Sequence, residues 1–205
     1  KILDNYQEKF SLKKIHIYGL SHNEKQKIEI ELNKLRNINI FKLTEDRVLK
    51  TLKKFNFLEN IYVNKVIPST ININLSKTLI IGKTLRNGEY FYIGKNGNFI
   101  KSNQLNETIN IPSVFGEFRI EEYIDLQNIL SENEVDLQNI EKYFYYKNKR
   151  WDLLFSNKLT LMLPSQNVAK SIKIYKKLLD SDNLINKKII DLRITNQIIL
   201  TNYNE

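Results

Sequence analysis

Apolar and polar side chains recur at regular intervals along most of the chain, and these intervals predict its secondary structure. Residues 12–18 alternate between the two kinds, as a half-buried strand does. Two helical stripes follow, formed by Ile28, Leu32 and Leu35 and then by Val48, Leu52 and Phe55. Two more strands are expected at residues 61–67 and 71–75. This β-α-α-β-β order predicts a three-stranded sheet with two helices on one face.

Both helices of this first region have recognisable N-terminal signals. Ser21 is followed three residues later by Glu24, the spacing of a capping box. Thr44 is expected to cap the second helix, because Glu45 and Asp46 follow it where the helix dipole favours acidic side chains.

Beyond residue 77 the pattern changes to short strands and hairpins. Strands are expected at residues 89–93, 99–102, 140–146, 150–155, 159–163, 188–194 and 197–200. Helices are expected at residues 120–130 and over the apolar stripe of Val168, Ile172, Tyr175 and Leu179. Residues 111–116 are expected to form an ordered loop. The fold class is therefore α+β: residues 1–10 lead in, residues 11–77 form the β-α-α-β-β domain, and residues 78–205 form a mostly antiparallel β domain with two helices.

The amino-acid composition indicates where the protein works and which kinds of chemistry it lacks. The chain has 205 residues, of which 41% are hydrophobic, so it can bury a substantial core. It has no Cys, which excludes thiol catalysis and favours an extracytoplasmic location. It also lacks the roughly 20 consecutive apolar residues of a spanning helix. Since the numbering opens at Lys1 rather than Met, we expect an excised piece whose N-terminal anchor has been removed.

The net charge of +9 has two interpretations. A basic protein can bind nucleic acid or an anionic membrane. Tyr143, Phe144, Tyr145 and Tyr146 beside Lys147, Lys149 and Arg150 resemble the mixture of rings and cations that stacks bases. However, Lys, Asn and Ile dominate the chain and all have A/T-rich codons, so genome composition also explains the charge.

No arrangement of residues predicts catalysis. The two imidazoles, His16 and His22, have no neighbours at ligand spacing, so no metal site is expected. The Glu121–Glu122 pair and the Glu132/Glu134 pair read as solvated surface rather than as an acid and a base. The Gly94–Gly97 segment lacks the spacing of a phosphate-binding loop and reads as a hairpin turn. We therefore predict no enzyme activity, no cofactor and no small-molecule substrate.

Several short motifs occur in a fixed order and spacing, from KIHIYG at residues 14–19 to KRWDL at 149–153 and IDLR at 190–193. Together they resemble the FtsQ (DivIB) family of cell-division proteins. Residues 14–19 (KIHIYG) are similar to the first strand of its POTRA domain, and residues 65–73 (KVIPSTINI) to the strands that end it. In the β domain the similar segments are residues 91–100, 111–117 (IPSVFGE), 149–153 (KRWDL) and 190–193 (IDLR). One departure stands at Ser76–Lys77, where the family commonly has a Glu-Arg pair.

This resemblance implies a non-catalytic scaffold of the bacterial divisome. Members have one transmembrane helix, with the POTRA and β domains in the periplasm at the division septum. They bind the FtsB/FtsL pair and help to control septal peptidoglycan synthesis. The last strands of the β domain add a strand from FtsB. The positions that match this binding region are Arg193, Ile194, Asn196, Ile198, Leu200 and Tyr203, together with Arg150 and Trp151, although Trp151 also reads as a core residue.

A physical argument also favours partner binding at the C-terminal strand. A terminal strand leaves unpaired N–H and C=O groups, and residues 197–200 carry neither charge nor proline to blunt them. Arg193 is suited to pairing with a carboxylate of the partner. Three alternatives stay open: the strand merely completes the sheet, the chain is another POTRA-bearing transport or assembly module, or it is a basic nucleic-acid-binding domain.

Overall fold

In the computed structural model of the protein, which describes residues 8–105, 110–179, 187–194 and 197–202, the chain forms two units. The first comprises residues 1–79 and 98–108, and the second comprises residues 80–97 and 109–205. The domain limits given above, at residues 10 and 77, stay a prediction; residues 1–7 of the expected lead-in lie outside the described residues.

The first unit has the predicted β-α-α-β-β order. Its elements are β1 (Lys14–Tyr18), α2 (His22–Leu32), the 3-10 helix η1 (Asn33–Leu35), α3 (Glu45–Leu52), β2 (Leu58–Val66) and β3 (Thr70–Lys77). The strand order is β1-β3-β2, with β1 parallel and β2 antiparallel to the central strand. Ile17 and Ile73 lie side by side on the buried face, which α2 and α3 cover. The opposite face of the sheet carries His16 and Asn72 and is polar.

Both predicted helix caps are confirmed. The backbone N–H of Ser21 donates to Glu24 Oε2 at 2.9 Å, as a capping box requires. Lys77 Nζ lies 3.2 Å from the other oxygen of Glu24, whose side chain is almost fully buried. Thr44 Oγ1 accepts a hydrogen bond from the backbone N–H of Arg47 at the start of α3. The ion pair to Lys77 joins the start of α2 to the end of β3.

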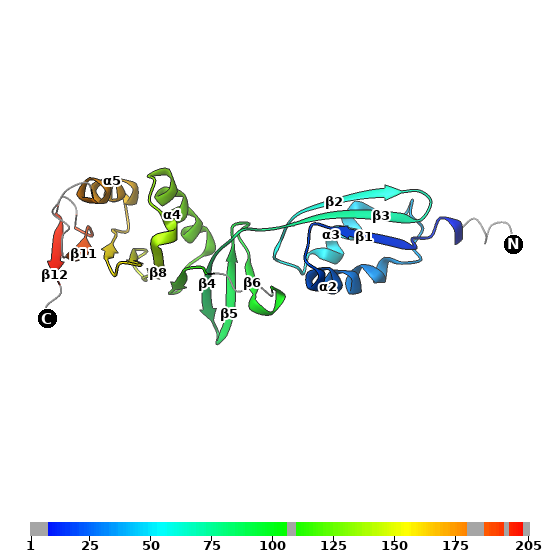
Figure 1. Ribbon diagram of the computed structural model, residues 1–205, viewed down its shortest axis with the longest axis horizontal. Helices are drawn as coiled ribbons and strands as arrows, with labels where there is room; N and C mark the ends of the chain where they lie inside the picture. The colour runs from blue at the N-terminus through cyan, green and yellow to red at the C-terminus, as the bar shows by residue number, and fades with distance from the viewer. Residues whose placement is uncertain (1–7, 106–109, 180–186, 195–196, 203–205) are drawn as a thin grey trace. The chain divides into compact units, whose positions relative to one another are not determined.

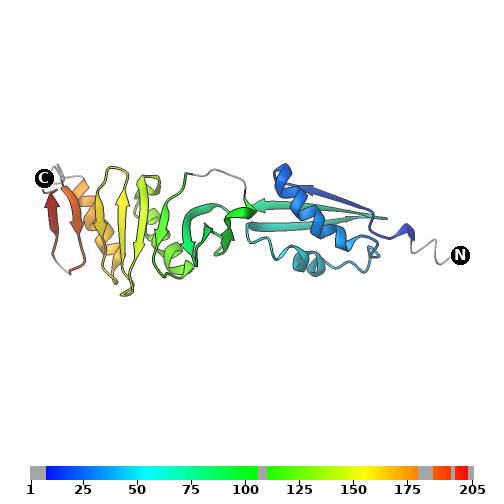
Figure 2. The same cartoon turned by 90° about the horizontal axis from the view of Figure 1, so that it is seen from below.

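The second unit is built around a long sheet that α4 and α5 cover on one face (Figures 1 and 2). The strands follow the order β12-β11-β10-β9-β8-β7-β4-β5-β6. Their bounds are β4 (Ile80–Arg86), β5 (Glu89–Gly94), β6 (Phe99–Lys101), β7 (Ser113–Phe115), β8 (Ile140–Tyr145), β9 (Trp151–Phe155), β10 (Thr160–Met162), β11 (Lys187–Asp191) and β12 (Ile199–Asn202). The helices of this unit are α4 (Ile120–Glu132), η3 (Leu137–Asn139) and α5 (Val168–Leu179), whereas β6 and the 3-10 helix η2 (Ser102–Gln104) fall within residues 98–108 of the first unit.

Two strands of this sheet were missing from the prediction. In β4 the apolar run is broken at Gly82, where the pairing with β5 also shifts register. A Cβ at Gly82 would lie 3.1 Å from both Tyr123 Oη and Val114 Cγ2, so a close approach to the core explains the glycine. The expectation of a loop at residues 111–116 was wrong for β7, because three residues are too few to show an alternating pattern.

The expected bounds of the two C-terminal strands were also wrong. Strand β11 ends at Asp191, and residues 192–194 leave the sheet instead of extending it. The backbone N–H of Gln197 donates to the carbonyl of Ile194 at 3.1 Å, which closes a turn between the strands. Strand β12 therefore begins at Ile199, two residues later than expected, and runs to Asn202.

Aromatic side chains fill the core between α4 and the sheet. Trp151 is only 5% exposed, and four rings lie within 6.5 Å of it: Phe118, Tyr123, Tyr143 and Tyr145. Gln127 of α4 donates to the hydroxyls of Tyr123 and Tyr143, at 2.9 and 2.8 Å. Tyr123 in turn donates to the carbonyl of Ile81 at 2.8 Å, so this buried polar network is satisfied and joins α4 to β4 and β8.

Replacing Gly116 by Ala is expected to destabilise the second unit by roughly 3 kcal/mol or more, because the backbone has φ +106° and the new Cβ would lie 2.3 Å from the carbonyl oxygen of Tyr145. Gly88→Ala is the matched control: φ is +78° but no atom lies within 4 Å, so a loss of about 1 kcal/mol is expected. Urea unfolding monitored by Trp151 fluorescence checks both. Equal losses in the two variants would contradict the predicted clash.

Replacing Glu24 by Gln is expected to lower the free energy of unfolding of the first unit by about 1–2 kcal/mol at pH 7. Burial alone raises the pKa of Glu24, but the hydrogen bonds from Ser21 and Lys77 together lower it below its usual value. The stabilisation is therefore complete above the unfolded-state pKa and disappears as the pH falls through the lower folded-state pKa. Urea unfolding followed by circular dichroism at pH 7 and pH 3, with Glu29→Gln as an exposed control on the same helix, tests whether the difference shrinks in acid.

Candidate functional site

Strand β12 lies at one end of the sheet, and the register shows which of its backbone groups face outward. The N–H of Leu192, just after β11, donates to the carbonyl of Met162 in β10. Because the backbone groups of successive residues point to opposite sides of a strand, the N–H and C=O of Ile190 also point toward β10. Asp191 and Ile189 therefore face β12, where they pair with Ile199 and Thr201. By the same alternation, the N–H and C=O of Leu200 point away from β11, toward the free side of the strand.

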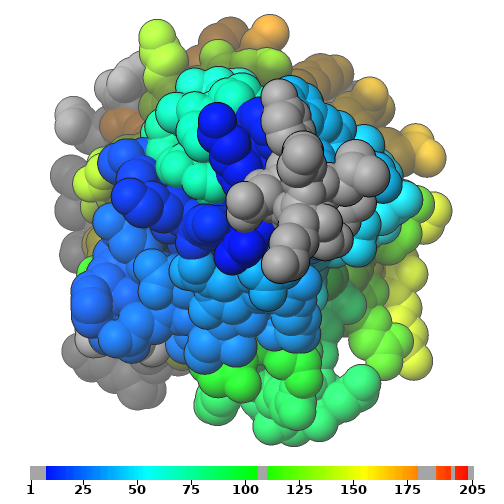
Figure 3. Space-filling view, turned by 90° about the vertical axis from the view of Figure 1, so that its right-hand side faces the viewer, coloured from blue at the N-terminus to red at the C-terminus, as the bar shows by residue number. Residues whose placement is uncertain are grey.

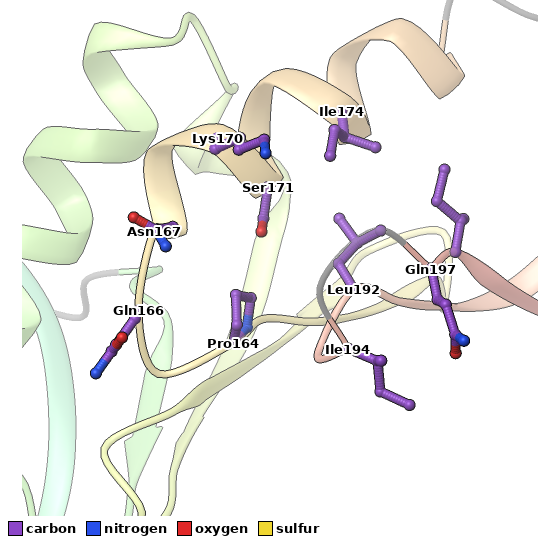
Figure 4. A pocket seen from close by; sticks show the side chains of 10 residues that line it. Pro164, Gln166, Asn167, Lys170, Ser171, Ile174, Leu192, Ile194 and Gln197 are labelled. Atoms are coloured by element: carbon purple, nitrogen blue, oxygen red, sulfur yellow. The ribbon is translucent and has the colours of Figure 1, made fainter.

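A pocket of about 350 Å³ lies between α5 and the segment that joins β11 to β12 (Figure 4). Leu192 and Ile174 supply apolar walls, and Lys170 and Gln197 supply polar groups. The other lining residues are Pro164, Gln166, Asn167, Ser171, Ile194 and Ile198. The pocket is thus continuous with the residues that enter β12 and is suited to an apolar side chain with a polar neighbour.

Apolar side chains are exposed around the pocket and the edge. Ile194 is 53% exposed and Ile198 is 47% exposed, although both line the pocket. Ile199, the first residue of β12, is 44% exposed. Three exposed isoleucines beside unpaired backbone groups form the kind of surface that another polypeptide covers.

An arginine and an aspartate form a tight pair at the end of β11. Arg193 Nε lies 2.8 Å from Asp191 Oδ1, and its Nη2 lies 2.5 Å from Asp191 Oδ2. These hydrogen bonds hold the pKa of Asp191 below its usual value, although partial burial opposes them. The same pairing raises the pKa of Arg193. The bidentate geometry fixes the guanidinium plane while leaving the side chain of Arg193 accessible at one edge.

A second arginine and aspartate lie on the same face of the sheet, at β9. Asp152 is separated from Asp191 by one residue of the intervening strand, Met162. Arg150 Nη2 is 3.7 Å from Asp152 Oδ2, and the Arg150 guanidinium lies 4.2 Å from the centre of the Tyr146 ring. Within the part of the chain that the structure describes, Arg150 Nε and Asp152 Oδ1 are buried without hydrogen-bond partners.

Burial dominates the electrostatics of Asp152. It raises the pKa of this carboxyl group, outweighing the hydrogen bond from Tyr146 and the charge of Arg150, which both lower it. The neighbouring charge of Asp191 raises the pKa of Asp152 further. A buried carboxylate with an unsatisfied oxygen is costly. In folded proteins such atoms are usually satisfied by an enclosed water molecule or mark local strain.

The structure brings most of the predicted residues into one region. Ile194 and Ile198 line the pocket, Arg193 is bonded to Asp191 at the end of β11, and Arg150 lies beside the carboxylate of Asp152. Leu200 pairs with Ile190 on the covered face, so its backbone rather than its side chain faces the free edge. Trp151 lies in the aromatic core. Asn196 and Tyr203 lie outside the described residues.

Sequence reasoning missed both aspartates and Ile199. Each aspartate stands two residues from an arginine, in Arg150-x-Asp152 and in Asp191-x-Arg193. In an extended chain such residues share a face, so this spacing was a usable signal for two charge pairs. The alignment of the two pairs across β10 depends on the strand order, which the local sequence does not reveal.

The site combines an accessible strand edge, a partly apolar pocket and two arginine–aspartate pairs. Among the residues that the structure describes, no group of three or more His, Cys, Asp or Glu side chains is placed to hold a metal ion. His16 is bonded to Asn72 at 3.1 Å, and His22 to Gln26 at 3.0 Å. The helices among these residues are all too short or too polar to cross a membrane.

Comparison with known proteins gives consistent results along the chain. The family described as "Cell division protein FtsQ/DivIB, C-terminal" matches residues 84–193, and the family described as "POTRA domain, FtsQ-type" matches residues 10–77. The cell division protein FtsQ of Rickettsia bellii is 26% identical over 196 residues, covering 95% of this chain and 73% of the relative. FtsQ of Rickettsia conorii is 25% identical, with the same coverage.

FtsQ of Zymomonas mobilis is 24% identical over 79% of this chain and 51% of the relative. Among solved structures, the major extracytoplasmic domain of DivIB from Geobacillus stearothermophilus gives a TM-score of 0.37 at 14% identity, covering 50% of this chain and 92% of that one. The FtsQ/DivIB C-terminal family alone matches more than half of the chain, and an FtsQ-type POTRA domain precedes it. The chain therefore belongs to the FtsQ/DivIB family of cell division proteins.

Proposed function

We propose that this protein is a non-catalytic scaffold of the divisome that binds FtsB/FtsL-type partners by adding a strand of the partner to β12. The observation that carries the proposal is the outward-facing backbone of Leu200 at the end of the sheet. The family match ends at residue 193, so the case for this edge rests on the strand order rather than on the match. In this role the protein works outside the cytoplasmic membrane at the division septum and helps to control peptidoglycan synthesis there.

Backbone hydrogen bonds provide the affinity in strand addition, and side chains beside the edge provide the specificity. The exposed side chains of Ile194 and Ile198 and the adjoining pocket favour an apolar residue on the partner. The guanidinium groups of Arg150 and Arg193 favour a partner with an acidic side chain. The preferred segment is therefore an extended peptide that carries apolar and acidic residues at separate positions.

Trp151 contributes indirectly to this site. Its ring is packed among Tyr143, Tyr145 and other aromatic side chains, so it is not available to the partner. Because residues alternate along β9, burial of Trp151 places Arg150 and Asp152 on the opposite face. The role we propose for Trp151 is therefore to hold β9 in the register that presents Arg150.

Replacing Ile198 by Pro is expected to weaken binding of an FtsB-derived periplasmic segment from the same organism at least tenfold, with little change in the melting temperature. Ile198 is two residues before Leu200, at the start of the outward-facing row, and proline has no N–H and obstructs an approaching strand. Isothermal titration calorimetry measures the change. Ile198→Thr is the matched control, since it reduces the side chain and keeps the N–H. An equal loss of affinity in both variants would assign the effect to the side chain instead of the edge.

Replacing Arg150 by Gln is expected to weaken the same complex by about tenfold, because a partly buried cation facing a partner carboxylate contributes more than a fully exposed one. The affinity of the wild-type protein should also fall more steeply with added salt than that of the variant. Lys149→Gln removes the adjacent exposed charge and serves as the control. If the two variants bind equally well, Arg150 is not part of the interface.

A further inference from the structure

The first unit has a tip at which three segments meet, formed by residues 8–14, 36–42 and 65–70; we call it the basic tip. The backbone N–H of Leu12 donates to Ile38 at 2.9 Å, and that of Ile40 donates to Phe10 at 2.8 Å. The backbone N–H of Lys13 donates to Ser69, in the turn between β2 and β3, at 2.8 Å. Figure 3 looks onto this end of the unit, where the dark-blue residues lie beside the turquoise turn.

Large apolar side chains are exposed on the basic tip. Phe41 is 63% exposed, Ile67 is 50% exposed and Val66 is 42% exposed. The ring of Phe10 lies 5.3 Å from that of Phe41, so the exposed ring is supported from one side. Single exposed apolar residues are common on protein surfaces, but several at one tip mark a surface that is covered in use.

Cations surround these apolar side chains. The three segments carry six basic residues and one acidic residue, Glu8; the basic residues are Lys9, Lys13, Lys14, Arg36, Lys42 and Lys65. On the helices of the same unit, cations are instead balanced by neighbouring carboxylates, as in the Lys50–Asp46 pair at 2.8 Å and the Lys34–Glu31 pair at 2.7 Å. The positive charge of the tip is therefore locally uncompensated.

The combination of exposed apolar side chains and cations favours one of two possible anionic partners, nucleic acid and an anionic bilayer, over the other. A nucleic acid offers phosphates and base faces, which suit cations and stacking rings but give no place for isoleucine and valine. The interface of an anionic bilayer offers phosphates above hydrocarbon, which suits aromatic and aliphatic side chains within a ring of lysines. Lysine side chains can also reach outward to headgroups while their methylene groups lie against apolar surface.

We propose that the basic tip docks on the surface of a membrane that contains anionic phospholipids, with Phe41 and Ile67 entering the headgroup region and the lysines contacting phosphates. The contact is peripheral and is independent of the proposed strand addition, which involves the other unit. It would hold the first unit at the membrane surface through side chains of its own.

Vesicle co-sedimentation with the 205-residue chain tests this proposal. The probes are vesicles of phosphatidylcholine alone and vesicles that also contain phosphatidylglycerol at about one third of the lipid. Binding is expected only with the anionic vesicles and should weaken with added salt. Lys13→Gln/Lys14→Gln should reduce the partition coefficient on the order of 20-fold, since each lysine near an anionic surface contributes about fivefold.

Matched controls separate the tip from the overall charge. Lys25→Gln/Lys53→Gln removes the same charge from α2 and the end of α3 and should bind nearly as well as the wild type. Phe41→Ser/Ile67→Ser should lose binding, whereas Ile30→Ser, at an exposed apolar position of α2, should not. Equal losses in the two lysine pairs, or no preference for anionic vesicles, would overturn the proposal. Binding of a DNA duplex but not of vesicles would overturn it in favour of nucleic acid.

Discussion

The proposed function depends on one physical feature, the outward-facing backbone of Leu200 in β12. Such an edge is also a hazard, because it can pair with other copies of the same chain. Here β12 is only four residues long, and the charged pair of Asp191 and Arg193 stands beside its first residue. A short edge next to fixed charges disfavours indiscriminate pairing, while it still admits a segment with complementary charge. In the proposed binding mode, the edge is therefore accessible to a partner strand but favours strands of complementary charge.

The position of that edge is set by packing at some distance from it. Trp151 packs against Tyr123 of α4, Phe155 packs against Tyr175 of α5, and Leu153 is fully buried, so the register of β9 is fixed by the core. Through β10, the same register aligns Asp152 with Asp191 on the opposite face. A shift of one residue in β9 would turn Arg150 and Asp152 toward α4 and move Trp151 to the opposite face of the sheet. The register of β9 therefore determines both which residues fill the hydrophobic core and which charged residues lie on the opposite face.

Periodicity was sufficient for the order of elements in the first unit, because its strands alternate and its two α-helices each have an apolar stripe and a cap, such as Ser21 with Glu24. It failed at β4 and β7 for different reasons: Gly82 interrupts an apolar run for the sake of packing, and β7 has three residues. The C-terminal strands were recognised, but their ends were misplaced, since residues 192–194 continue the alternation after leaving the sheet. Among the site residues, the arginines were predicted through the family resemblance. The aspartates that hold them became apparent only when the strand order aligned β9 with β11.

The two charge pairs are not equivalent, because only one of them is fully satisfied by the protein itself. Arg193 satisfies Asp191, and the pKa of this carboxyl group is lowered accordingly. Asp152 is buried with one unsatisfied oxygen, and its pKa is raised, so its carboxylate form weakens the free protein near neutral pH. The unpaired N–H of Arg150 needs an acceptor and the unpaired oxygen of Asp152 needs a donor. Both atoms are buried, so the cost of leaving them unpaired falls on the packing around β9 rather than on a surface that a partner covers.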